Sequence, residues 1–444
     1  RFVTRDPEDL LRPGENAGAL VKLGSFSNTD GYKASGTAFG YLVLLLLSPV
    51  ITRLYTPEVF GVFAVFNAIV AIGSVFMSQS LELGMLSAKR TGQSFEVAKL
   101  AMVLATLVSV VTIMAVTIAG FFFPAIFTET LPIWIVVFGV VTCWIATATT
   151  VGLNWAIRRN RTGLAASATF VNLSGRSLLQ SIFGVLLGGL PGLVFGEILG
   201  RLAGWLMIER GLTKRAFKVS KPKYHSLLQT YKKNKNYPLL VTPANAMDSA
   251  LFWLPAPLFS FAFGLEAGGL IAIVQRLGAI PLTLVNQSIA QLFHINVTKL
   301  IRINPGVLIA FIYRFIVIVC VAALPVGISL AAYGEQIVSV ALGSLWSQAG
   351  VVALVMLPMY VTQTINLLSL RVILVEGHFK MRFCIAAGTT SMMVFSVMLG
   401  RFFEMSWMET LALQTGFLMF SFGGTTAFAI YKLRHEVRKL SAAS

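Results

Sequence analysis

Six charged residues lie away from the ends of apolar stretches of this chain that are long enough to cross a bilayer. A charge at the bilayer centre costs at least about 2.5 kcal/mol on insertion scales, so such a residue usually faces protein or water and has a function there. Four of the six are basic and two are acidic, which describes a site suited to an anion. The six are Arg176, Glu197, Arg201, Asp248, Arg276 and Arg314.

Arg176 and Arg276 each belong to a polar stripe along one face of a predicted helix. Asn172, Arg176 and Gln180 recur at four-residue spacing, which places all three on the same face. The stripe of Arg276 continues with Thr283, Gln287 and Gln291. We expect a bound substrate to contact both arginines together with Asn172, Gln180 and Gln287. For each arginine, the alternative is a hydrogen bond to a carbonyl group of a neighbouring helix.

Glu197 and Arg201 lie four residues apart on one predicted helix and can neutralise each other, which lowers the cost of burying either charge. We interpret them as a structural ion pair. The same stretch carries a glycine at every fourth position, which predicts a smooth ridge where a second helix packs closely. These glycines are Gly192, Gly196, Gly200 and Gly204.

Two further charged positions leave alternatives open. Asp248 is the only aspartate in any apolar stretch. It is a candidate to carry a coupling H⁺ or Na⁺, to pair with an arginine, or to line a cavity. Arg314 is either a third basic contact to the substrate or a residue near the cytoplasmic end of its helix.

The chain lacks the motifs of several enzyme classes. It has no G-x-x-x-x-G-K-[ST] phosphate loop, and the loops opposite the basic ones are short for a membrane glycosyltransferase or polymerase. We therefore expect no enzyme, no metal and no other cofactor. The histidines are far apart in sequence, and the cysteines stand singly without C-x-x-C, so we also expect no disulfide. These residues are His225, His294, His378, His435, Cys143, Cys320 and Cys384.

The amino-acid composition indicates which kind of structural element carries these charged residues. The 444 residues are 56% hydrophobic and only 12% charged, whereas a typical soluble domain is about 25% charged. This leaves too little polar surface to cover a soluble fold. The chain therefore reads as an all-α integral membrane protein that crosses the bilayer several times.

Twelve apolar windows can be placed, each about 20 residues or longer, the length that spans a hydrocarbon layer. They cover 34–56, 59–84, 98–123, 131–156, 163–188, 191–209, 237–263, 267–293, 305–331, 347–370, 383–401 and 408–431. Most Lys and Arg lie in or next to alternate connections, while only Arg53 and Arg401 lie at the window ends next to the opposite connections. This asymmetry predicts that both termini are cytoplasmic. It also explains the net charge of +17 without a nucleic-acid partner.

An internal repeat divides the windows into six and six. Shifting the chain by 208 residues aligns 38–80 with 246–288, with ten of 43 residues identical, including Pro49 with Pro257. Two such halves predict lobes around a central cavity near the midplane, as in transporters. We expect a cytoplasmic tail at 1–33, an N-lobe at 34–212, a basic linker at 213–236, a C-lobe at 237–433 and a second tail at 434–444.

Three short stretches resemble known motifs. Residues 54–61 read LYTPEVFG, residues 276–281 read RLGAIP and residues 343–350 read GSLWSQAG. In this order and within twelve spans, they resemble bacterial polysaccharide-unit (O-antigen type) flippases of the multidrug/oligosaccharidyl-lipid/polysaccharide exporter superfamily. Of the candidate site residues, only Arg276 is carried over by position, and Arg176 depends on its stripe.

The resemblance implies a flippase of the bacterial inner membrane in polysaccharide and lipopolysaccharide biosynthesis. Its substrate would be an undecaprenyl-diphosphate-linked oligosaccharide, moved by alternating access through a cationic cavity. Membrane lipids, a glycan polymerase and other polysaccharide assembly proteins are the implied partners. Arginine suits the diphosphate, and Asn, Gln, Ser and Thr suit sugar hydroxyls.

Three alternatives remain open. A flippase of lipid-linked peptidoglycan precursor would need the same cationic cavity. A drug or cation antiporter of the same superfamily would depend more on Asp248 than on the arginines. A membrane glycan polymerase or transferase is the alternative from another functional class.

Overall fold

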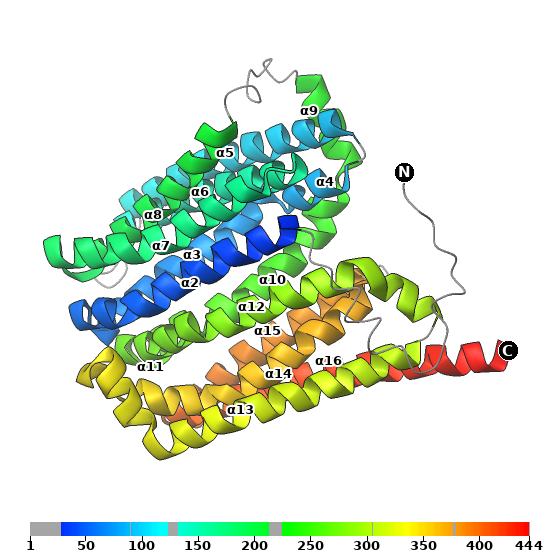
Figure 1. The fold of residues 1–444 in the computed structure, drawn as a ribbon. Coiled ribbons are helices and arrows are strands. Elements are labelled where there is room, and N and C mark those ends of the chain that lie inside the picture. Colours follow the sequence, from blue (N-terminus) through cyan, green and yellow to red (C-terminus); the bar gives the residue numbers. More distant parts are fainter. Residues whose placement is uncertain are drawn as a thin grey trace.

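The computed structural model describes residues 28–88, 90–122, 132–212, 224–303, 305–375 and 379–443, and these residues are almost entirely helical. The helices form two bundles that lie side by side (Figure 1). The N-lobe contains α2 (Asn28–Leu54), α3 (Pro57–Ser78), α4 (Leu81–Ser87), α5 (Thr91–Phe122), α6 (Ile133–Arg158), α7 (Thr162–Leu186) and α8 (Gly189–Leu212).

The second bundle, the C-lobe, follows a short helix, α9 (Tyr224–Lys233), and a turn of π-helix, η3 (Tyr237–Val241). It contains α10 (Thr242–Trp253), α11 (Pro255–Phe263), α12 (Leu265–Ile303), α13 (Pro305–Leu342), η4 (Ser344–Trp346), α14 (Ala349–Val375), α15 (Phe379–Phe402) and α16 (Trp407–Ala443). Each of the twelve apolar windows contains a helix. The all-helical, two-lobe fold predicted from the sequence is therefore confirmed.

Apolar length explains most of these helices. Among the described residues, nine helices are long and apolar enough to cross a membrane, and a bent pair adds a tenth. The remaining two long helices are α7 and α16, which are less apolar. In α7 the polar stripe around Arg176 lowers the hydropathy. The helix with the strongest candidate for chemistry is thus one with a weaker membrane signal.

The two halves differ at their matching prolines. Helix α2 continues through Pro49, whereas the chain bends by 54° between the segments Tyr237–Trp253 and Pro255–Phe263. Pro255 and Pro257 remove two backbone N–H donors within three residues, so the helical ladder cannot continue there. The window 237–263, expected as one straight span, is therefore a broken one.

The predicted tails and linker overlap with helices. Helix α2 begins at Asn28, inside the expected tail 1–33, and residues 1–27 lie outside the described ranges. Helix α16 continues to Ala443 through the expected tail 434–444. In the expected linker, residues 213–223 also lie outside the described ranges, and α9 occupies most of the rest.

Two residues in left-handed conformation interrupt the second span. Gln79 and Ser80 have φ values of 50° and 53°, which ends α3 and starts α4. Just beyond the break, one carboxylate oxygen of Glu82 is buried and has no hydrogen-bond partner among the described residues. A position near the end of the window 59–84 would allow Glu82 to reach the headgroups. The break instead turns it inward.

The lobes meet closely at the end of the molecule where α2 and α3 join. The Trp346 indole is fully buried, donates a hydrogen bond to the Thr52 carbonyl (2.8 Å), and meets the Phe60 ring edge-on at 5.1 Å. A Cβ on Gly61 would lie 2.1 Å from the Leu265 carbonyl oxygen. We call this contact the Trp346 seam. The motif stretches 54–61 and 343–350 therefore build a lobe–lobe contact.

Candidate functional site

Close packing between α7 and α8 positions the polar side chains of the N-lobe. A Cβ on Gly200 would lie 2.4 Å from the backbone nitrogen of Arg176, and one on Gly196 would lie 2.5 Å from that of Gln180. Only glycine allows two helix backbones to approach so closely. The predicted glycine ridge thus presses α8 against the polar stripe of α7.

This packing brings Glu197 under the stripe. One carboxylate oxygen, Oε1, accepts hydrogen bonds from Arg176 Nη1 at 2.9 Å and from Arg201 Nε at 2.8 Å. The other oxygen, Oε2, accepts from Gln180 Nε2 at 3.2 Å. The sequence-predicted partners Glu197 and Arg201 therefore lie within ion-pair distance. Arg176, assigned from sequence to the substrate, shares the same carboxylate.

Gln180 extends the cluster to the other lobe. Its side-chain oxygen accepts a hydrogen bond from Arg276 Nη2 of α12 at 2.9 Å, and its backbone carbonyl accepts one from the Tyr55 hydroxyl at 2.8 Å. Gln180 is fully buried. We call the five side chains Arg176, Gln180, Glu197, Arg201 and Arg276 the N-lobe network, although the last belongs to the C-lobe. The network joins the two lobes in mid-span.

The network carries unbalanced charge. Three guanidinium groups stand against one carboxylate, which leaves an excess of two positive charges. The Glu197 side chain is 4% exposed, whereas those of Arg176 and Arg201 are 19% and 18% exposed. Arg176 and Arg201 are thus more accessible than the carboxylate that they bind. An anion that approaches the network meets donors first.

The other residues predicted to contact substrate lie less centrally. The backbone carbonyl of Asn172 accepts a hydrogen bond from Arg176 Nε at 3.2 Å, and its side chain is half-buried on the same face. Arg314 is exposed on α13 and does not belong to the network. The side chain of Gln287 lies outside the residues whose side chains are described.

Asp248 lies in a second cluster, near the start of the C-lobe. Its carboxylate accepts a hydrogen bond from Arg382 Nη2 at 2.6 Å, and the same nitrogen donates to Asn245 Oδ1 at 2.9 Å. Asn245 Nδ2 in turn donates to Ser80 Oγ, at the α3–α4 break, at 3.0 Å. We call Ser80, Asn245, Asp248 and Arg382 the C-lobe cluster. It pairs one acid with one base and crosses between the lobes.

The sequence did not indicate the roles of two residues here, Arg382 in the C-lobe cluster and Tyr55 beside the N-lobe network. Arg382 was counted among the charges of a cytoplasmic connection, but it lies in the first turn of α15. An aspartate inside a span needs a cation, and the sequence offered several arginines without indicating which of them pairs with Asp248. The Tyr55 hydroxyl was known only as part of a motif, and nothing in the spacing linked it to Gln180.

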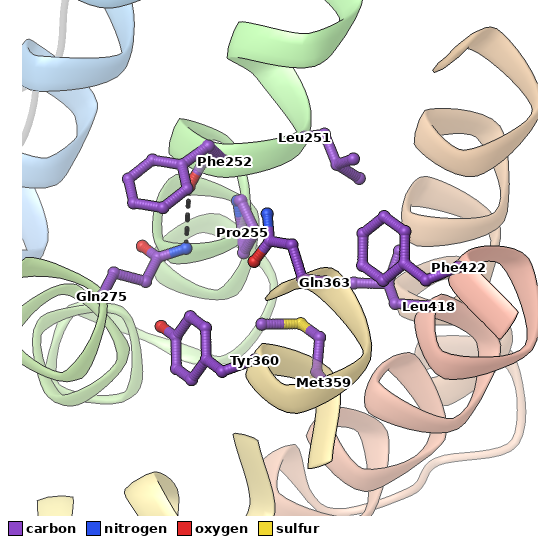
Figure 2. A pocket seen from close by; sticks show the side chains of 9 residues that line it. All are labelled: Leu251, Phe252, Pro255, Gln275, Met359, Tyr360, Gln363, Leu418 and Phe422. Carbon is purple, nitrogen blue, oxygen red and sulfur yellow. Dashed lines mark hydrogen bonds between the residues drawn. The ribbon is translucent and has the colours of Figure 1, made fainter. Parts of the chain in front are cut away.

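One cavity of the C-lobe is small. A cavity of about 10 Å³ lies between α10, α11, α12, α14 and α16, and Figure 2 shows Gln275 and Tyr360 at its edge among apolar side chains. Gln275 donates a hydrogen bond to the Phe252 carbonyl at 3.0 Å. A volume of this size holds about one water molecule. It does not hold a sugar or a drug.

Neither lobe assembles a metal site from the described residues, in which no three His, Cys, Asp or Glu side chains gather. The donors that do gather are guanidinium and amide N–H groups. Such donors recognise carboxylates and phosphates. The N-lobe network therefore carries donors of the kind that can bind an anion.

Comparison with known proteins yields structural relatives alone: no protein-family model and no curated sequence matches the chain. An inward-facing multidrug resistance MATE family transporter of the MOP superfamily has a TM-score of 0.70 at 14% identity, over 95% of this chain and 98% of its own. The outward-facing form of such a transporter has a TM-score of 0.59 at 14% identity, over 92% and 96%.

A third relative is a MOP superfamily transporter from Pyrococcus furiosus, with a TM-score of 0.61 at 14% identity over 92% of this chain and 96% of its own. Its description reports a binding pocket of reverse polarity that suggests a different function. At this level of identity the likeness concerns the fold alone. The chain has the fold of the MATE transporters of the MOP superfamily.

Proposed function

We propose that this protein is a flippase that moves a lipid-linked oligosaccharide with a diphosphate headgroup, such as an undecaprenyl-diphosphate-linked unit, across the bacterial inner membrane. The observation that carries the proposal is the charge imbalance of the N-lobe network, with three arginines against one glutamate. A carrier of organic cations would need the opposite sign of charge. Polarity of the binding site also distinguishes one structural relative from others.

The proposed headgroup fits the donors. Arg176 and Arg276 come from different lobes and both present guanidinium nitrogens around Gln180. A diphosphate has two phosphoryl groups and can therefore accept from both lobes at once. Asn172, half-buried beside Arg176, offers an amide to the sugar hydroxyls. The polyprenyl chain would stay in the bilayer.

Transport would proceed by alternating access, with the lobes rocking around the headgroup. The Trp346 seam closes the lobes at one end, and the fold matches an inward-facing relative better than an outward-facing one, at TM-scores of 0.70 and 0.59. In this account the headgroup enters from the cytoplasm, where both termini would lie. Opening then requires the Trp346 seam to separate.

A drug or cation antiporter is the second candidate, because relatives of the same fold are described as multidrug resistance transporters. In that case Asp248 would bind the cation. Its carboxylate is 35% exposed but already holds Arg382 at 2.6 Å, which makes a positive ligand compete with an arginine. A peptidoglycan-precursor flippase shares the anionic headgroup, and the assay below separates it from a polysaccharide exporter.

The test replaces Arg176 and Arg276 together by alanine in cells that depend on this protein for surface polysaccharide. We expect surface polysaccharide to fall by about 100-fold or more, since each lost charge-assisted bond costs about 1.5–3 kcal/mol. Arg314→Ala, on an exposed arginine, is the matched control. Normal polysaccharide with normal protein level in the double variant would refute the proposal, and loss of drug efflux in Asp248→Asn with normal surface polysaccharide would favour the antiporter.

A further inference from the structure

Glu197 occupies the place in the N-lobe network that a ligand anion would seek. Its Oε1 atom takes one hydrogen bond from each of Arg176 and Arg201, at 2.9 and 2.8 Å. Carboxylate and phosphate oxygens use the same guanidinium donors with similar geometry. While Glu197 holds these nitrogens, the corresponding bonds are denied to any other anion.

The Glu197 carboxylate is more deeply buried than the side chains of Arg176 and Arg201 that bind it. Glu197 is flanked on α8 by Gly196 and Gly200, where the two helices touch backbone to backbone. Its side chain is 4% exposed, and Gln180 holds its second oxygen. The arginine side chains are longer and reach the accessible side. A ligand would therefore draw the guanidinium groups away from Glu197 and leave the carboxylate where it is.

A structural ion pair does not account for this arrangement. One arginine would suffice to neutralise Glu197, yet two bind the same oxygen and a third is attached through Gln180. The surplus keeps the site attractive to an anion, and the shared carboxylate limits how tightly that anion is held. A carrier needs both properties, because a ligand bound too tightly is not released.

We propose that Glu197 is the internal counter-ion of the anion site: it organises the arginines in the empty carrier and competes with the substrate phosphate for them, which sets affinity and allows release. This inference rests on the proposed function, since it assumes an anionic ligand. It makes Glu197 an affinity-determining residue and leaves the recognition of phosphate to the arginines.

The test measures binding of inorganic pyrophosphate and of undecaprenyl diphosphate to the purified full chain and to Glu197→Gln. The amide keeps the shape of the side chain but removes the charge that competes for the arginines. We expect the dissociation constants to fall by about 10- to 100-fold, the range of one charge-assisted hydrogen bond. Release of labelled lipid after transport should slow in parallel. Glu335→Gln, an exposed glutamate of α13, is the matched control.

A structural role predicts the opposite sign, because disordered arginines would bind pyrophosphate more weakly. Equal or weaker binding by folded Glu197→Gln would overturn the inference. Should that variant fail to fold, Glu197→Asp keeps the charge but cannot reach both arginines, and it should bind pyrophosphate tighter than the unmodified chain. Equal or weaker binding by this variant would likewise overturn the inference. If even the unmodified chain binds neither compound, the proposed function fails as well.

Discussion

Two polar clusters cross between the lobes, and they differ in charge balance. The C-lobe cluster pairs one aspartate with one arginine, at 2.6 Å, and hydrogen bonds through Asn245 continue the cluster to Ser80. The N-lobe network holds three arginines around a single glutamate and a glutamine. Both are partly buried and both join the lobes. One is neutral and the other carries surplus positive charge.

The net charge of each cluster decides whether a ligand can bind there. A balanced pair already has its best partners, so a ligand of either sign must break an ion pair and replace it. An unbalanced network has desolvated positive charge that lacks a counter-ion, and an anion lowers its free energy by binding. Partial burial and position between the lobes are common to both clusters and do not distinguish them. The charge balance therefore marks the N-lobe network as the candidate ligand site and the C-lobe cluster as a structural contact between the lobes.

The largest expected effect comes from breaking the helix contact that builds the N-lobe network. Gly200→Ala places a Cβ 2.4 Å from the Arg176 backbone nitrogen, so α7 must move away from α8. We expect a loss of about 1–3 kcal/mol of stability, as for overpacked cores, together with loss of pyrophosphate binding. Apparent Tm in detergent measures the first. Gly416→Ala is the control, because no atom lies within 4 Å of its added Cβ, and an equal effect there would contradict the account.

A smaller loss of stability is expected when the Asp248–Arg382 ion pair of the C-lobe cluster is broken. A double-mutant cycle measures it. Asp248→Asn and Arg382→Gln should each cost about 1 kcal/mol, because each leaves the opposite charge unpaired. The double variant should cost less than the sum of the two. Chemical unfolding in detergent measures all four proteins. Strict additivity would mean that the pair contributes nothing to stability.

The smallest loss of stability should come from Arg201→Gln, which removes one of the three positive charges of the N-lobe network. Glu197 still accepts hydrogen bonds from Arg176 and Gln180 after this change, so stability should fall by only about 0.5 kcal/mol, as for a mild single substitution. Pyrophosphate affinity should nevertheless drop, since the surplus charge is reduced. A large loss of stability with unchanged affinity would show that the surplus arginine is structural.

The helices could be predicted from the sequence more completely than the contacts between them. Apolar length and the glycine spacing on α8 are local properties, so the two-lobe fold and a close helix contact at this ridge could be expected from them, but not that α7 makes the contact. The partner of Asp248 could not, because Arg382 lies 134 positions away. The contact between Gln180 and Arg276 depends on how the lobes meet, which no periodicity records.

The most direct test of the central claim compares ligands of opposite charge on one purified protein. Binding of undecaprenyl diphosphate and of ethidium should be titrated against the unmodified chain and against Arg176→Gln/Arg276→Gln. We expect undecaprenyl diphosphate to bind to the unmodified chain, salt to weaken this binding, and the double variant to lose it. Ethidium binding that survives in the double variant, with no binding of undecaprenyl diphosphate to either protein, would contradict it.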